Sequence, residues 1–261
     1  MATLEPREKA ERIAELFRRR RPTEVFPTEL YPGSLDEAYA IQREFREIEQ
    51  ARGRGAVVGY KIGLTTPIMQ KVCGVDEPCY GAMFASEVHH RRAEISAREY
   101  CRIGVETEIA FRLGSDLPHG GDRSRVVAAV ESAMAAIELI EDLHFDYRRL
   151  DAAALVAGNV WNAGAVVGAP VWEWRGFDLA RATARLLING REIGSGTGGE
   201  VMGHPLDALA WLADKLAAAG APLQRGMIVL TGSTVPIQYP APGDRVLVEV
   251  SSLGTAELAV T

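Results

Sequence analysis

The chain has 261 residues, of which 47% are hydrophobic and 25% are charged, a composition typical of water-soluble globular proteins. The formal net charge of -6 argues against nucleic-acid binding, which usually needs a basic face. The sequence shows neither a secretory signal nor an apolar run long enough for a membrane span, so we expect a soluble cytoplasmic protein. Its three cysteines are too few and too widely spaced to indicate a disulfide framework.

The first part of the chain has helical patterns. Apolar residues at helical spacing predict a helix over 7–20, and the arginine run at its end is typical of a solvated last turn. The capping box Ser34-Leu35-Asp36-Glu37 predicts a second helix over 35–52. We therefore expect residues 1–55 to form an N-terminal helical section.

The rest of the chain, residues 56–261, reads as a strand-rich catalytic domain with short strands between Gly/Pro turns. Asn189-Gly190 predicts a type I′ hairpin turn. Two helices are expected, over 124–135 and over 205–219, with His204 placed to cap the second. Strands are expected at 105–113, 136–140, 163–167, 184–188, 227–230 and 246–250. The fold class is therefore α+β, with both sections forming one functional unit.

The strongest chemical signal is the pair Glu106 and Glu108 in an apolar strand. Because side chains alternate faces along a strand, the two carboxylates should point to the same side. Adjacent carboxylates repel unless a cation lies between them or the face is solvated, and oxygen ligands suit Mg²⁺, Mn²⁺ or Ca²⁺. The pattern alone leaves both a solvated face and a metal site open.

Two further charged residues lie in apolar surroundings. Glu138 sits in Ala136-Ile137-Glu138-Leu139-Ile140, where an unpaired carboxylate would be costly to bury. It either binds a metal or pairs with a buried Lys or Arg. Lys61, flanked by Gly59 and Gly63, either binds a substrate oxygen or lies on a surface strand.

A third candidate segment is Thr231-Gly232-Ser233, which offers hydroxyls and backbone N–H groups for a carboxylate, or forms a plain turn. The Gly194–Gly199 stretch matches G-x-G-x-x-G literally, but it lacks the strand–turn–helix context of a dinucleotide site, so we expect a flexible loop near a site. No signature of nucleophilic catalysis is visible.

Several segments together resemble the 2-keto-4-pentenoate hydratase and 4-oxalocrotonate decarboxylase branch of the fumarylacetoacetate hydrolase superfamily. The resemblance runs almost end to end, and its order and spacing are more specific than any one piece. The segments that carry it are Gly59-Tyr60-Lys61-Ile62-Gly63-Leu64-Thr65, Glu106-x-Glu108-Ile-Ala-Phe, Ala136-Ile137-Glu138-Leu139-Ile140, Gly203-His204-Pro205-Leu206 and Ile228-Val229-Leu230-Thr231-Gly232-Ser233.

The resemblance implies a mixed β-roll with an N-terminal helical section. It implies a Mg²⁺ or Mn²⁺ ion held by Glu106, Glu108 and Glu138, with Lys61 as the catalytic residue. The substrate class would be small 2-oxo or 2-hydroxydienoic acids from aromatic-compound degradation. The substrate-binding residues that we expect are Thr65, Asn159, Thr231, Gly232 and Ser233.

This sequence departs from the family pattern at two places near the expected substrate. Cys79 stands where relatives commonly have Asp, and Gly158-Asn159-Val160-Trp161 replaces the usual Asp-Asn-Ala-Ser or Asp-Asn-Ala-Ala. These changes favour a different, bulkier or less polar substrate.

The expected activity is a hydratase, a carbon–oxygen lyase. A 2-oxo-acid decarboxylase, an acylpyruvate hydrolase and an inactive partner subunit are the alternatives. The resemblance also favours a homo-oligomer or a hydratase–decarboxylase complex.

Overall fold

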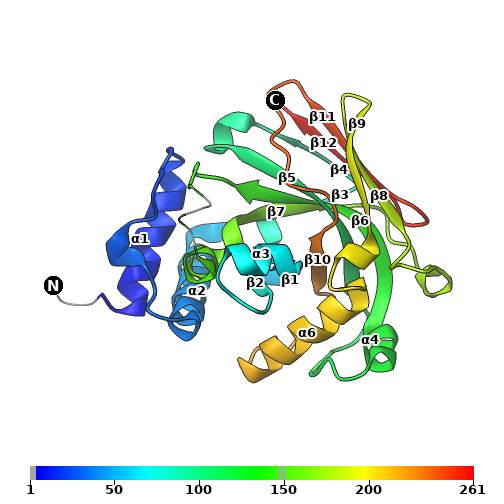
Figure 1. Ribbon diagram of the computed structural model, residues 1–261, viewed down its shortest axis with the longest axis horizontal. Coiled ribbons are helices and arrows are strands. Elements are labelled where there is room, and N and C mark those ends of the chain that lie inside the picture. The colour runs from blue at the N-terminus through cyan, green and yellow to red at the C-terminus, as the bar shows by residue number, and fades with distance from the viewer. Residues whose placement is uncertain (1–3, 147–148, 150) are drawn as a thin grey trace.

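The protein consists of two β-sheets with helices packed around them, and the computed structural model describes residues 4–146, 149 and 151–261 (Figure 1). The helices are α1 (Pro6–Arg19), α2 (Leu35–Glu49), α3 (Pro67–Val72), α4 (Arg123–Ala129), α5 (Ala152–Ala157) and α6 (Pro205–Ala218). The strands are β1 (Val57–Gly63), β2 (Cys79–Phe84), β3 (Val88–His90), β4 (Arg92–Ile95), β5 (Ile103–Leu113), β6 (Val130–Glu141), β7 (Asn162–Val167), β8 (Thr183–Ile188), β9 (Arg191–Thr197), β10 (Ile228–Ser233), β11 (Arg245–Val250) and β12 (Gly254–Val260). This arrangement confirms the expected α+β fold. Within the described residues, no helix is long and apolar enough to cross a membrane.

The N-terminal helices α1 and α2 pack against each other at one end of the molecule (Figure 1). Ser34 caps α2 by accepting a hydrogen bond from the Glu37 backbone N–H at 3.1 Å. The Glu37 carboxylate binds the Gly33 backbone N–H at 2.6 Å and the buried Lys9 ammonium at 2.6 Å. The helix ends in a turn through Arg54, beyond which Gly55 takes a positive φ of 82°. Both predicted N-terminal helices are thus confirmed, while a domain division at residue 55 stays a prediction.

Two sheets enclose the main core. The seven-stranded sheet has the order β2-β1-β10-β5-β6-β7-β3, and the five-stranded sheet has the order β4-β12-β11-β8-β9. Strand β5 turns Val105, Ile109 and Phe111 towards the core between the sheets, where they join apolar residues of β11 and β12. Because side chains alternate along β5, Glu106 and Glu108 lie on its other face.

The predicted helix over 124–135 is wrong in its second half. Helix α4 ends at Ala129 and β6 begins at Val130. Residues such as Ala133 and Met134 have good helical propensity, but they pair with Phe111 and Ala110 of β5 and are buried on both faces of the sheet. Tertiary packing therefore overrides the local preference here.

Other local predictions are confirmed. Asn189 and Gly190 have φ values of 53° and 79°, as the hairpin turn between β8 and β9 requires. His204 Nδ1 accepts a hydrogen bond from the Leu206 backbone N–H at 3.0 Å and caps α6. The predicted loop over 194–199 is instead mostly strand β9, in which a Cβ on Gly196 would lie 2.0 Å from the Thr234 carbonyl oxygen. A glycine is needed at position 196 because the two backbones approach too closely to leave room for a side chain.

Candidate active site

Three glutamates converge on the face of the large sheet opposite the main core. Glu106 and Glu108 project from β5, and Glu138 on β6 is the direct cross-strand partner of Glu106. Their carboxylates offer oxygen atoms that all lie within 4.8 Å of one another. The prediction that Glu106 and Glu108 share one face is therefore confirmed.

Protein donors satisfy only part of this cluster. Glu108 Oε2 accepts a hydrogen bond from the Gly232 backbone N–H at 2.7 Å. Glu138 Oε1 lies 3.0 Å from Lys61 Nζ and accepts a hydrogen bond from Asn162 Nδ2 at 2.9 Å. The other oxygens, Glu108 Oε1 and Glu138 Oε2, are buried and have no hydrogen-bond partner among the described residues. A buried carboxylate oxygen without a donor is costly, so a cation is the partner that this geometry lacks.

The electrostatics support the same conclusion. Burial raises the pKa of Glu106 to about 7, against the attraction of Lys61, and repulsion from Glu138 adds to the rise. Burial and the two neighbouring carboxylates raise the pKa of Glu108 well above its usual value. Burial would lower the pKa of Lys61, yet attraction to the three carboxylates outweighs it and raises that pKa. One lysine thus faces three acids, and this oxygen-rich donor set fits a divalent cation.

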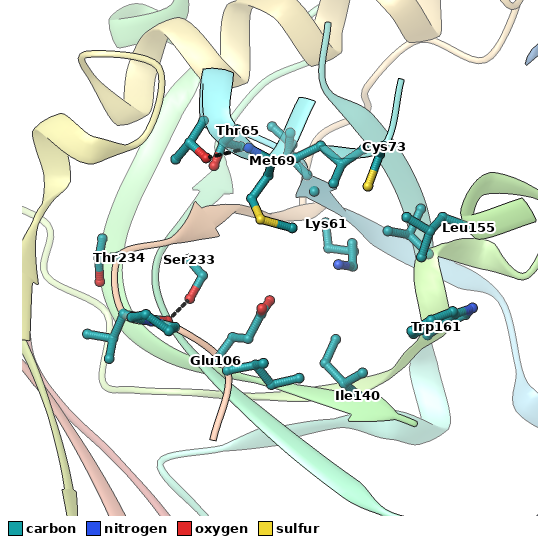
Figure 2. Close-up of a pocket in the computed structure, with 18 of the residues that line it drawn as sticks. Lys61, Thr65, Met69, Cys73, Glu106, Ile140, Leu155, Trp161, Ser233 and Thr234 are labelled. Atoms are coloured by element: carbon teal, nitrogen blue, oxygen red, sulfur yellow. Dashed lines mark hydrogen bonds between the residues drawn. The ribbon is translucent and has the colours of Figure 1, made fainter. Parts of the chain in front are cut away.

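A cavity of about 370 Å³ opens beside Lys61 and Glu106 (Figure 2). On one side of these two residues lie hydroxyl groups from Thr65, Ser233 and Thr234. On the other side lie apolar side chains from Ile140, Leu155 and Trp161. The cavity therefore has a polar end, a charged middle and an apolar end.

The structure brings some of the expected substrate-binding residues to the cavity and not others. Thr65 and Ser233 line it. Thr231 is fully buried and its hydroxyl donates to a β5 carbonyl at 2.8 Å. The Gly232 N–H donates its hydrogen bond to the Glu108 carboxylate. The side-chain amide of Asn159 binds the main chain of Ala82 through both its oxygen and its nitrogen, at 2.7 and 2.9 Å. Asn159 thus holds its own segment against β2 and is not among the cavity-lining residues.

One residue of the site was not singled out from the sequence. Asn162 orients Glu138, and its signal was a polar residue at the start of an otherwise apolar strand. Asp142, which follows the end of β6, is fully buried and accepts hydrogen bonds from Arg102 and Tyr239. Asp142 therefore supports the fold beside the site.

Cys79, which departs from the family pattern, lies next to Lys61 in the interior. Burial raises the pKa of its thiol to about 12, so it remains neutral. The negative charge that Lys61 meets therefore comes from the three glutamates.

Comparison with known proteins agrees with the fold. The family model of the fumarylacetoacetate (FAA) hydrolase C-terminal domain matches residues 74–261. The chain belongs to this family. It is 34% identical to a 2-keto-4-pentenoate hydratase of Burkholderia vietnamiensis, covering 88% of this chain and 87% of that protein. It is 36% identical to the TodF product hydratase of Pseudomonas putida, covering 86% of this chain and 84% of that protein.

Two solved structures have a similar fold. A 4-oxalocrotonate decarboxylase from Pseudomonas putida G7, complexed with magnesium and adipate, superposes with a TM-score of 0.90 at 25% identity, covering 98% of this chain and 97% of that one. A fumarylpyruvate hydrolase from Pseudomonas aeruginosa, in complex with Mn²⁺ and pyruvate, gives a TM-score of 0.61 at 15% identity, covering 77% of this chain and 88% of that one. At this identity, the similarity to the fumarylpyruvate hydrolase shows a shared fold and nothing more.

Proposed function

We propose that this protein is a divalent-metal-dependent hydratase that adds water to a 2-hydroxy-2,4-dienoate, or to its 2-oxo tautomer, in aromatic-compound degradation. The observation that carries the proposal is the cluster of three glutamates, with Glu108 and Glu138 fully buried, beside Lys61 at a cavity that also offers hydroxyl groups. Identity of 34–36% to proteins named as hydratases, over most of the chain, supports hydration as the reaction.

Glu106, Glu108 and Glu138 would hold Mg²⁺ or Mn²⁺, because carboxylate oxygens are hard ligands and Glu108 Oε1 and Glu138 Oε2 have no hydrogen-bond partner among the described residues. When bound, such an ion would act as a Lewis acid on the C2 oxygen of a 2-oxo acid. The 4-oxalocrotonate decarboxylase with this fold was solved with magnesium, which supports a divalent ion.

The protein's own groups would orient the substrate and move protons. Lys61 is fixed by Glu138, and its ammonium faces the cavity, where it would donate to a substrate oxygen or pass a proton during tautomerisation. The hydroxyls of Thr65 and Ser233 lie where they would meet the substrate carboxylate. The Ser233 hydroxyl donates to the Val235 carbonyl at 2.6 Å, and it would exchange this bond for one to the substrate. The apolar walls would exclude water other than the reacting molecule.

A 2-oxo-acid decarboxylase is the second candidate, because the 4-oxalocrotonate decarboxylase superposes over almost the whole chain. The same metal and lysine would serve it, with release of CO₂ in place of water addition. An acylpyruvate hydrolase and an inactive partner subunit are the remaining alternatives.

Ultraviolet decay of freshly generated 2-hydroxydienoates tests the proposal. We expect decay with Mg²⁺ or Mn²⁺, none with chelator, a product heavier by one water and no CO₂. Release of CO₂ would identify the decarboxylase, and fragmentation into two acids would identify the hydrolase. Absence of decay on every dienoate, with metal bound, would contradict the lyase and favour the inactive subunit.

We also propose a cytoplasmic homo-oligomer, or a complex between hydratase and decarboxylase subunits. Helix α3 supports association, because Ile68 and Val72 are 75% and 56% exposed on its surface. Exposed apolar side chains that lie together are typical of interaction sites. Light scattering should give a mass that is a multiple of one chain, and a monomer across the concentration range would contradict the homo-oligomer.

A further inference from the structure

We call the apolar end of the cavity the tail compartment. Its walls include Cys73, Ile140, Leu155 and Trp161, and Val160, the neighbour of Trp161 in the chain, also lines the cavity. Among the described residues that line the whole cavity, Lys61 is the one basic side chain, and it lies in the middle beside Glu106 (Figure 2). Burial raises the pKa of the Cys73 thiol, so this wall residue is neutral as well. The tail compartment therefore offers apolar surface without a compensating charge.

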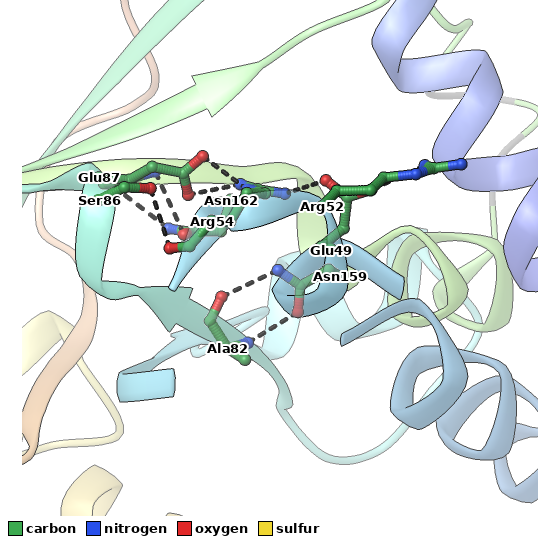
Figure 3. A network of polar contacts seen from close by, with 9 residues as sticks. Glu49, Arg52, Arg54, Ala82, Ser86, Glu87, Asn159 and Asn162 are labelled. Atoms are coloured by element: carbon green, nitrogen blue, oxygen red, sulfur yellow. Dashed lines mark hydrogen bonds and ion pairs between the residues drawn. The ribbon is translucent and has the colours of Figure 1, made fainter. Parts of the chain in front are cut away.

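The wall at Trp161 is held in an unusual backbone conformation. Asn159, Val160 and Trp161 have φ values of 56°, 51° and 55°, three consecutive non-glycine residues in the left-handed region. This region is costly, above all for a β-branched residue such as Val160, and it persists where the surroundings enforce it. Figure 3 shows the enforcing contact, in which the Asn159 amide binds both main-chain groups of Ala82. This contact thus holds the strained segment in place and fixes Val160 and Trp161 in the cavity wall.

Behind this wall lies a second cavity, which we call the polar cavity. It has a volume of about 470 Å³, and Trp161 lines it as well as the tail compartment. Its other walls carry charged groups, among them Arg20 and Glu141, and Arg20 is close enough to act on the pKa of Glu141. Trp161 is 3% exposed, and its ring packs against that of Phe145 with 5.2 Å between centroids and the ring planes tilted by 33°. It therefore separates apolar space from polar, charged space.

We propose that the tail compartment takes an uncharged, apolar substituent at the distal end of the substrate, and that Trp161 determines this specificity by closing the compartment off from the polar cavity. The orientation of the substrate in the cavity rests on the proposed function, in which its 2-oxo acid end lies beside Lys61 and the three glutamates. The substrate is then a monocarboxylic acid with an alkyl or aryl tail. A dicarboxylic acid would have to bury its second carboxylate without a cation or a donor.

This specificity differs from that of the related decarboxylase, which was solved with adipate, a dicarboxylate. An apolar tail also gives a chemical reason for Val160 and Trp161. Small side chains at these positions would leave the wall open, and acidic side chains would leave it charged. The carbon chain of the tail gains from burial in proportion to its length, by roughly four-fold in affinity for each methylene group.

Binding of unreactive, saturated 2-oxo acids tests the inference without relying on turnover. With Mn²⁺-loaded protein, calorimetry would compare pyruvate, 2-oxooctanoate and 2-oxosuberate, the last having the same chain length as 2-oxooctanoate but a terminal carboxylate. We expect 2-oxooctanoate to bind more tightly than pyruvate, and 2-oxosuberate to bind on the order of 100-fold more weakly than 2-oxooctanoate. Equal or tighter binding of 2-oxosuberate would overturn the proposal.

Two variants test the role of Trp161. Trp161→Ala should join the tail compartment to the polar cavity and reduce the preference for 2-oxooctanoate over 2-oxosuberate by roughly ten-fold or more. Trp161→Phe, the matched control, keeps an apolar wall and should retain the preference. An unchanged preference in a Trp161→Ala protein that still binds Mn²⁺ would overturn the assignment. The wild-type comparison remains decisive if that variant fails to fold.

The two proposals fail in different ways. Absence of turnover on every dienoate, together with tight binding of 2-oxooctanoate, would contradict the hydratase and support the tail specificity. Turnover of dienoates together with preferred binding of 2-oxosuberate would support the lyase and overturn the tail specificity.

Discussion

Glu108→Gln should have opposite effects on the metal-free and the metal-loaded protein. Glu108 is fully buried and its pKa is raised, so the metal-free protein either takes up a proton there or keeps like charges together. At an effective dielectric constant of about 20, like charges at the 4.8 Å limit of this cluster repel by about 3.5 kcal/mol, which sets the scale of either cost. Lys61 offsets part of the repulsion from Glu106 and Glu138, so we expect the metal-free variant to be more stable than wild type by roughly 2 kcal/mol. The Gln carbonyl still accepts from the Gly232 N–H, so charge is removed and the hydrogen bond is kept.

With metal present, the same variant loses a ligand. We expect Mn²⁺ affinity to fall by at least about 10- to 100-fold, which removes most of the stabilisation that bound metal gives to the folded state. Urea unfolding with chelator and with Mn²⁺ would measure both effects. Glu131→Gln is the matched control, because Glu131 is a partly exposed glutamate of β6 paired with Arg112 and should change neither quantity. Equal destabilisation of both forms, or unchanged Mn²⁺ affinity, would refute the reasoning.

Three further predictions concern single side chains. Lys61→Met should lower kcat by about 100-fold or more while Mn²⁺ still binds, as steady-state kinetics and calorimetry would show; near-normal kcat would contradict its role. Burial raises the pKa of Glu141 to about 7, above its usual 4.5, so wild-type stability falls as pH rises through this window. Glu141→Gln should match wild type below pH 4.5 and exceed it by up to about 3 kcal/mol above pH 7 in urea unfolding, and a pH-independent difference would contradict this. Asn159→Ala should cost about 2–4 kcal/mol in the same assay, since it removes both bonds to Ala82; a loss near zero would show that they do not hold the segment.

Local rules predicted the parts of the site that lie on regular strands. Alternation along β5 was enough to place Glu106 and Glu108 on one face, because the period of a strand is independent of what it packs against. The apolar surroundings of Glu138 indicated that it needs a partner, but left metal and lysine as alternatives. The structure places it close to both Lys61 and the other two glutamates.

The parts that the sequence did not predict depend on contacts between distant segments. Residues 130–135 prefer helix locally and become strand through pairing with β5. Asn159 was expected to contact the substrate, but its side-chain amide is hydrogen-bonded to the main chain of Ala82, seventy-seven residues earlier in the chain. The left-handed turn of Val160 and Trp161 follows from that contact, and no local propensity would favour it.

The most direct test of the central claim is turnover measured as a function of bound Mn²⁺, with the bound ion quantified by electron paramagnetic resonance. If the three glutamates hold the catalytic ion, dienoate turnover should rise in proportion to bound Mn²⁺ and level off at one ion per chain. Metal-free protein should be inactive, and Glu138→Gln should lose binding and turnover together. Full turnover in metal-free protein, or Mn²⁺ binding that is unaffected by Glu138→Gln, would contradict the account.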